Sequence, residues 1–144
     1  MKLVIKAKGH PNIRATHKST WQFTKEDHLT PRGDCIIGVA ASHSALELST
    51  EIKGWLQKGN WVAFELQVGE LIFRGKGQGN SDLQFTDSHD MVFRRSDFIS
   101  ERTVTINTDF AAIDLPEKLR TRLLDPNQEI YLTISPIDQN QEHL

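Results

Sequence analysis

The sequence contains one cysteine, Cys35, among its 144 residues. A single thiol excludes an intramolecular disulfide framework and any metal site built from several thiolates. A free cysteine is usually buried, and a catalytic thiol needs a cationic neighbour and solvent access. The neighbouring residues, Asp34 and the apolar run Ile36-Ile37-Gly38-Val39, supply neither. We therefore expect Cys35 to be a buried and unreactive side chain.

Long hydrophobic runs are also absent. No run approaches the roughly 20 residues that span a bilayer, and lysines interrupt the apolar residues at the N-terminus, unlike those of a signal peptide. Hydrophobic residues make up 38% and charged residues 25% of the chain, which is typical of a globular protein. We expect a cytoplasmic protein that makes no contact with membranes.

The chain has no linker, no low-complexity segment and no recognisable repeat. Its length suits one domain that buries a real core. We predict a single β-rich domain over residues 1–138, followed by a frayed tail at 139–144.

The sequence has no large excess of either charge, because its formal net charge is −2. This balance gives the whole protein no electrostatic attraction to nucleic acid. Residues 1–32 nevertheless hold seven basic and two acidic side chains, whereas the remainder is acidic. The basic segment fits a solvated strand face, and a face that attracts an anion or RNA is the alternative.

Residues 12–23 alternate in polarity with a period of two, which is typical of a half-buried strand. His17 falls on the apolar side of this pattern, together with Ile13, Ala15, Trp21 and Phe23. A histidine among apolar groups must find a hydrogen-bond partner or a ligand. We predict that His17 points inward and has such a partner.

Similar patterns predict the other elements. Further strands are expected at residues 2–8, 35–41, 60–68, 71–76, 83–85, 91–95, 103–107 and 129–135. Two short helices are expected, one at 48–58 capped by Ser49 and one opened by a capping box at 114–117. Gly69-Glu70 suits a two-residue hairpin turn. The predicted fold is mainly β, a sandwich- or barrel-like domain with two short helices.

The glycine-rich segment Gly75-Lys76-Gly77-Gln78-Gly79 resembles a phosphate loop only in composition. Such a loop needs a helix directly after it, and here a strand-like stretch follows. A bulge or loop is the preferred interpretation.

Metal and cofactor sites are not indicated. No two of the six histidines have the i, i+4 spacing of a helical zinc site, so we expect no metal and no cofactor. Arg94 and Arg95 must project to opposite faces of a strand, and an inward arginine must be paired. The carboxylates expected to pair with it are Asp34, Asp97 and Asp109. The alternative role for such an arginine is anion recognition.

Four sequence blocks together resemble one family. The blocks are Gly9-His10-x-Asn12-Ile13-x-Ala15-Thr16-His17, Leu29-Thr30-x-x-Gly33-Asp34-Cys35-Ile36-Ile37-Gly38-Val39, Arg95-Ser96-Asp97-Phe98-x-x-x-Arg102-Thr103 and Asp109-x-Ala111-Ala112-x-Asp114-Leu115. They are similar to the signatures of a small, mainly archaeal family that is catalogued only as a domain of unknown function. The resemblance spans nearly the whole chain and implies a β-sandwich-like domain, but it implies no activity.

The polar residues of these blocks supply the candidate site. Our leading hypothesis is a binding module for a small anionic or polar ligand, with ligand-binding residues His10, Asn12, Thr16, His17, Asp34, Arg95, Ser96 and Arg102. A satisfied internal polar network is the structural alternative. Two other functions stay open: an enzyme that uses His17 or His10 as general acid or base with arginine stabilisation, and an RNA-associated protein. The sequence leaves the oligomeric state open.

Overall fold

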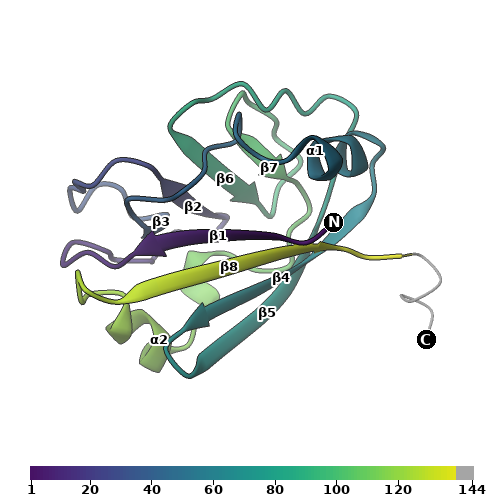
Figure 1. The fold of residues 1–144 in the computed structure, drawn as a ribbon. Coiled ribbons are helices and arrows are strands. Elements are labelled where there is room, and N and C mark those ends of the chain that lie inside the picture. Colours follow the sequence, from purple (N-terminus) through teal and green to yellow (C-terminus); the bar gives the residue numbers. More distant parts are fainter. Residues whose placement is uncertain (139–144) are drawn as a thin grey trace.

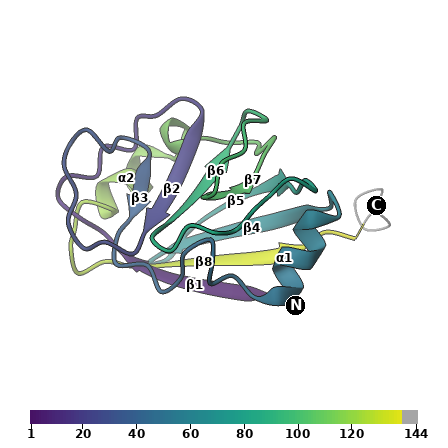
Figure 2. The ribbon, with the colours of Figure 1, turned by 90° about the horizontal axis from the view of Figure 1, so that it is seen from above.

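Eight strands form two four-stranded sheets that pack face to face (Figures 1 and 2). The computed structural model describes residues 1–138, and the tail expected at 139–144 lies outside the described residues. The first sheet has the order β1 (Leu3–Lys8), β8 (Glu129–Pro136), β4 (Trp61–Val68), β5 (Leu71–Gln78). The second has the order β3 (Ile36–Gly38), β2 (Thr20–Thr24), β6 (Asp90–Arg94), β7 (Thr103–Thr105). The predicted mainly β class is confirmed.

Two short helices lie at opposite ends of the sandwich (Figure 1). In α1 (Thr50–Gln57) the Ser49 side chain accepts a hydrogen bond from the Ile52 amide, as its sequence predicted. The predicted cap of α2 (Glu117–Arg122) is wrong, because Pro116 precedes that helix and provides no side-chain bond. Asp114 instead ends a 3-10 turn, η1 (Ala112–Asp114).

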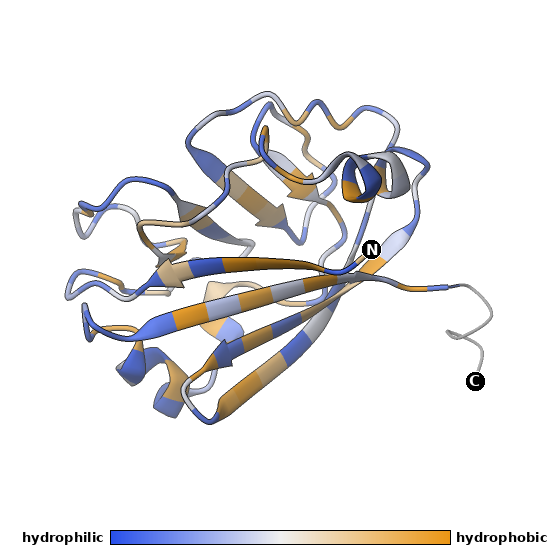
Figure 3. Ribbon diagram, in the orientation of Figure 1, coloured by the Kyte–Doolittle hydropathy of each residue, from blue (hydrophilic) through white to orange (hydrophobic). Residues whose placement is uncertain are grey.

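The core fills the space between the sheets, and β1, β4 and β8 of the first sheet alternate between buried residues and more exposed ones. Hydrophobic and hydrophilic residues alternate accordingly along these strands (Figure 3). Its centre is aromatic. Trp21 stacks on Phe93 at 3.8 Å between ring centroids and on Phe110 at 4.8 Å, and it meets Phe64 edge-on at 5.2 Å. Offset and edge-on ring contacts of this kind stabilise a core beyond the area that they bury.

Three predicted strands are wrong in extent or existence, and the backbone gives the reason. Ala15 has a φ of 50° and Phe85 a φ of 54°. Left-handed backbone does not fit a β-ladder, so residues 12–19 and 83–85 are irregular and β2 begins at Thr20. Ala40, with a φ of 51°, likewise lies beyond the end of β3.

Two of the alternating glycines, Gly75 and Gly77, do not interrupt a strand, as the sequence had suggested, but lie within β5. A Cβ atom on Gly75 would lie 2.5 Å from the ring of Phe110, and one on Gly77 would lie 2.7 Å from the Thr105 hydroxyl. The glycines therefore admit side chains of the second half of the chain into the core.

The structure also corrects the expectation that the chain has no repeat, because its two halves have the same arrangement of elements. Both halves have the element order strand, strand, strand, helix, strand. Exchanging β1 with β5, β2 with β6, β3 with β7 and β4 with β8 only reverses the order of each sheet. The two halves are therefore related by a pseudo-two-fold axis. Between residues 9–24 and 79–94 only a glycine, a threonine and a phenylalanine coincide, so the sequence hides the repeat.

Hydrogen bonds repeat along with the strands. Lys8 and Val39 exchange two backbone hydrogen bonds, and so do their counterparts Gln78 and Ile106. These bridges join each edge strand of the first sheet to a segment that follows an edge strand of the second. They close the sandwich partly into a barrel.

The same correspondence explains two further glycines. A Cβ atom on Gly79 would lie 2.0 Å from the Leu56 carbonyl oxygen at the end of α1. On Gly9, its counterpart, a Cβ atom would lie 2.5 Å from the Leu123 carbonyl oxygen after α2. In both halves, glycine lets the chain pass directly over the end of a helix.

We predict that Gly79→Ala lowers the free energy of unfolding by roughly 1–3 kcal/mol, because the methyl group meets backbone that cannot swing away. Gly54→Ala in α1 is the control, since nothing lies within 4 Å of its Cβ position. That change should stabilise the protein by about 0.5–1 kcal/mol. Urea denaturation measures both variants. Equal stability of the two would contradict the packing described.

The turn between β4 and β5 is fastened to α2 by a bidentate pair between Arg122 and Glu70. The hydrogen bond from Arg122 holds the pKa of Glu70 at about 2, below its ordinary value of 4.5. A lowered folded-state pKa stabilises the protein above the unfolded value, and this contribution disappears as the pH falls through the folded value.

We therefore predict that Glu70→Gln lowers the melting temperature slightly at neutral pH, and that the difference from wild type shrinks between pH 4.5 and about 2. Thermal melts across this range measure it. Glu101→Gln, an exposed glutamate with no fixed partner among residues 1–138, is the control. A difference that grows on acidification would refute the linkage.

Candidate functional site

The outer face of the second sheet, directed away from the core, is polar at its centre. Trp21, Phe23, Met91 and Phe93 point inward, so the alternate residues of β2 and β6 point outward. These are Thr20, Gln22 and Thr24 of β2 and Asp90, Val92 and Arg94 of β6. Gln22 and Val92 face each other at the pseudo-two-fold axis. Surrounding loops bury Gln22 to 4% exposure.

Irregular segments lead into β2 and β6 through matching turns. Ahead of β6, Asp87 Oδ1 accepts hydrogen bonds from the amides of His89 and Asp90 at 2.8 and 2.7 Å. Ahead of β2, His17 Nδ1 accepts hydrogen bonds from the amides of Ser19 and Thr20, both at 3.1 Å. The imidazole of His17 thus performs the role that a carboxylate performs in the other half.

His10 behaves in the same way. Its Nδ1 accepts a hydrogen bond from the Asn12 amide at 3.0 Å, and its counterpart Asn80 accepts one from Asp82 at 2.8 Å. An imidazole nitrogen that accepts from a backbone amide carries no proton itself. The lone pairs of both His10 and His17 are therefore engaged in turns, and in the neutral ring Nε2 carries the proton.

A groove of about 530 Å³ lies beside the N-terminal end of β6. It lies between the irregular segment before β6 and the loop before β7. The amides of Thr86 and Asp87 hold these two segments together by donating to the Glu101 carbonyl oxygen, both at 3.2 Å. Its lining is polar and consists of Gln84, Asp87, Asp90, Ser100, Glu101 and Arg102.

Arg102 is held loosely in this groove. Its guanidinium lies 3.5 Å from Asp90, with 44% and 22% of the two side chains exposed. No side-chain hydrogen bond of Arg102 occurs within the described residues. Most of its N–H donors are therefore available to a ligand.

Arg94 and Arg95 diverge at the end of β6, as the sequence predicted. Arg94 donates to the hydroxyls of Thr103 at 3.0 Å and Ser100 at 3.2 Å. Its burial lowers the pKa of the guanidinium, and the nearby charge of Arg102 lowers it further. Arg95 pairs with Asp114 at 3.0 Å.

The expected carboxylate partners of these arginines were Asp34, Asp97 and Asp109, and they are wrong. Arg102 pairs with Asp90 and Arg95 with Asp114. The first pair joins the loop before β7 to the neighbouring strand β6, and the second joins the end of β6 to the 3-10 turn η1, so both depend on the tertiary fold.

Cys35 is only half-buried, so the expectation of a fully buried thiol is corrected. Its thiol donates to Gln22 Oε1 at 3.1 Å. Burial raises the pKa of the thiol, whereas Arg102 acts in the opposite direction. Cationic neighbours thus do exist, but tertiary structure supplies them, and the neutral thiol remains favoured.

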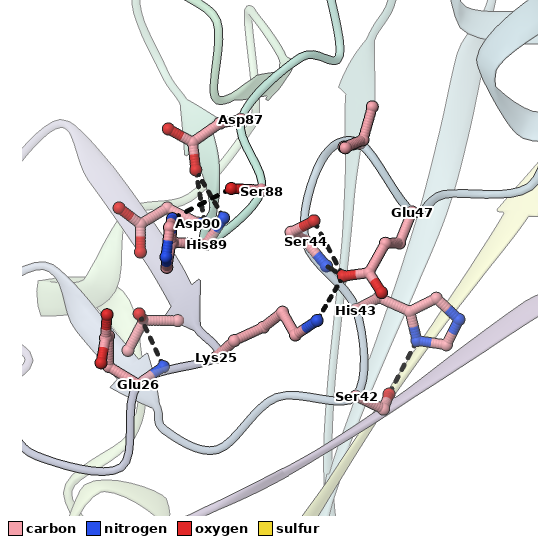
Figure 4. Close-up of polar contacts among 12 residues, drawn as sticks. Lys25, Glu26, Ser42, His43, Ser44, Glu47, Asp87, Ser88, His89 and Asp90 are labelled. Carbon is pink, nitrogen blue, oxygen red and sulfur yellow. Dashed lines mark hydrogen bonds and ion pairs between the residues drawn. The ribbon is translucent and has the colours of Figure 1, made fainter.

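A second group of polar contacts lies at the same end of β6 (Figure 4). Lys25 pairs with Glu47 at 2.7 Å, and Ser44 also donates to that carboxylate. This pair is the counterpart of Arg95 with Asp114, which is linked to the amide of Ala111. Because the two pairs occupy equivalent places in both halves, we assign them to fastening loops rather than to a site.

The predicted site residues do not all meet. The amides of Thr16 and His17 donate to the Asp34 carbonyl oxygen, and the Arg95 amide donates to the Ser19 carbonyl oxygen at 2.8 Å. Arg102 is the member that lines the groove.

The remaining predicted residues make local contacts or lie elsewhere. The His10 amide donates to the Leu123 carbonyl oxygen after α2. The Asn12 side chain donates to the Leu29 carbonyl oxygen at 2.7 Å, and Ser96 Oγ accepts from the Phe98 amide. These contacts are structural.

Sequence reasoning missed most of the groove. Asp87 and Asp90 would have been found by aligning the two halves at an offset of 70 residues, which places Asp87 opposite His17 and Asp90 opposite Thr20. Gln22 became notable only in the structure, because all five residues of β2 are buried and a polar side chain there needs a reason.

Residues 1–138 contain no group of three or more histidine, cysteine or acidic side chains arranged to hold a metal ion. Within the same range, no helix is long and apolar enough to cross a membrane.

The comparisons agree with the resemblance of the four blocks. The family model described as "Domain of unknown function (DUF371)" matches residues 5–137. The chain belongs to this family. A relative from Methanocaldococcus jannaschii, described as the uncharacterized protein MJ0206, is 39% identical over 134 residues, which cover 93% of this chain and 99% of that protein. Membership thus extends over both halves of the repeat, and the family description names no activity.

We predict that His17→Asp retains most of the stability, because aspartate accepts the same turn bonds in the other half. His17→Leu should lower the free energy of unfolding by roughly 1–3 kcal/mol, since the part-buried amides of Ser19 and Thr20 lose their acceptor. Urea denaturation of both variants measures the difference. If His17→Leu were the more stable of the two, the turn would not depend on the imidazole.

Proposed function

We propose that this protein binds a small polar ligand in the groove beside β6, and that Arg102 holds an anionic group of that ligand. The observation that carries the proposal is the state of Arg102. Its donors face a groove of about 530 Å³ and have one loose contact with Asp90 at 3.5 Å. A guanidinium in such a position is suited to carboxylate or phosphate recognition.

The carboxylates of the groove refine the ligand class. Asp87 is engaged by two amides, whereas Asp90 and Glu101 are available beside Arg102. A ligand that combines an anionic group with hydroxyl or ammonium donors would satisfy both signs of charge. A simple hydrocarbon ligand would leave these groups unpaired, at a cost in free energy.

The second cavity, of about 570 Å³, is a weaker candidate. It lies between the β4–β5 turn and α2, and its lining includes Glu70 and Arg122. Those two side chains already satisfy each other by two hydrogen bonds. Their pairing accounts for the charges there without a ligand.

The two alternative functions gain less support. A general base at His10 or His17 needs a free lone pair, and the turns engage both. RNA binding beside Arg14 and Lys18 needs an exposed aromatic platform, and Trp21 and Phe23 are fully buried in the core.

We predict that a panel of phosphates, nucleotides, amino acids and small carboxylates includes ligands that raise the melting temperature of the wild type but not of Arg102→Ala. The reason is that the variant loses the guanidinium of Arg102, which lines the groove. Differential scanning fluorimetry measures the shifts.

Arg74→Ala is the matched control. Arg74 is also loosely paired, at 3.6 Å from Glu65, but it lies on the first sheet outside the groove. Its variant should respond to ligands like the wild type. Equal responses of all three proteins would exclude Arg102 as the ligand contact.

A further inference from the structure

Hydrogen-bond donors without acceptors gather on the outer face of the second sheet, next to the groove. Gln22 is the central one. It is 4% exposed, and its amide oxygen accepts the Cys35 thiol at 3.1 Å. Its amide nitrogen has no hydrogen-bond partner within residues 1–138. That nitrogen is not one of the fully buried side-chain atoms that lack a partner, so it reaches solvent at the outer face of the sheet.

The backbone brings Cys35 and Arg102 to either side of Gln22. The Gln22 amide donates to the Cys35 carbonyl oxygen at 3.0 Å, and the Val92 amide donates to the Arg102 carbonyl oxygen at 2.8 Å. Both amides therefore point away from each other, so Gln22 and Val92 form a non-hydrogen-bonded pair with Cα atoms about 4.5 Å apart. The side chains of such a pair lie close together.

Arg94 supplies the second group of free donors. Two of its nitrogens are committed to Thr103 and Ser100, and its third nitrogen has no partner in the described chain. Its guanidinium also lies 4.9 Å from the ring centroid of Phe98, which is 61% exposed. Arg94 does not line the groove itself, but its bond to Ser100 holds it next to a residue that does.

Unsatisfied donors therefore come from three segments: Gln22 from β2, Arg94 from β6 and Arg102 from the loop before β7. The nearest carboxylate, Asp90, is shared only with Arg102, at 3.5 Å. Two guanidinium groups that influence each other electrostatically are also costly to hold together without an anion. None of these donors is a fully buried atom without a partner, so each is accessible from outside and available to an acceptor.

We propose that a phosphate group binds on the outer face of the second sheet, between Arg94 and Arg102 and above Gln22, with the Cys35 thiol at its edge. A phosphate fits better than a carboxylate because its terminal oxygens project in several directions and can meet donors from three segments. This inference rests on the proposed function and names the anionic group of the groove ligand.

The single cysteine allows a direct test. Inorganic phosphate is the probe, and chloride at matched ionic strength is the control. The rate at which Cys35 reacts with a thiol-specific disulfide reagent is followed in each buffer. We expect phosphate to slow the reaction several-fold in the wild type, because it covers the approach to the thiol. An unchanged rate in the wild type would overturn the proposal.

Variants separate binding from general effects. Arg102→Gln and Gln22→Leu should lose the protection by phosphate, and Arg74→Ala should keep it. Arg102→Gln alters an exposed side chain and serves if Gln22→Leu does not fold. Protection that persists in Arg102→Gln would also overturn the proposal, since the phosphate would then lie elsewhere.

The two proposals can fail separately. If a panel ligand stabilises the wild type through Arg102 but phosphate does not protect Cys35, the groove binds a ligand and the phosphate position is wrong. If phosphate protects Cys35 through Arg102 and inorganic phosphate is the one member of the panel that stabilises the protein, the anion site stands and the binding of a larger polar ligand in the groove fails.

Discussion

The antiparallel pairing of β2 with β6 is the constraint on which the rest of the structure depends. It joins the two halves of the repeat at the pseudo-two-fold axis, with Gln22 opposite Val92. Its inner face supplies Trp21 and Phe93, whose stacked rings form the centre of the core. Its outer face carries the polar residues of the candidate site. One pairing register thus fixes both the core and the position of every donor above it.

The repeat explains features that no single half explains. Where the second half places Phe110 in the core, β5 has Gly75 to receive its ring. Where the first half has His43 at the surface, β1 has the buried Ile5. In the first half the side chain of Ile5 fills the space that the ring of Phe110 fills in the second half. Dense packing of a core requires such a replacement.

The sequence predicted the elements whose signals are local. Ser49 as a helix cap, the Gly69-Glu70 turn and the alternation of β4 and β8 all depend on neighbouring residues, and all were confirmed. The failures share a different cause. Left-handed backbone at Ala15 and Phe85 ended two apparent strands, because alternation of polarity does not report the sign of φ. The internal repeat was hidden because equivalent turns use different chemistry, an imidazole in one half and a carboxylate in the other.

The candidate site was harder to predict because it is assembled across the axis. His10 and His17 attracted attention as polar residues among apolar ones, yet their nitrogens serve turns. Arg102 was predicted as a site residue, whereas Gln22 and Arg94 were not. Their interest comes from side-chain donors that have no acceptor among the described residues, and a sequence does not show this.

A polar side chain within a buried strand lowers stability unless its polar atoms are satisfied. An apolar residue fits the outer face of the second sheet, as Val92 shows. Gln22, at the equivalent position on β2, instead places an amide there, whose oxygen accepts the Cys35 thiol and whose nitrogen is not fully buried. The amide oxygen therefore has a structural partner in Cys35, whereas the nitrogen stays accessible from outside the sheet, on the face that also carries Arg94.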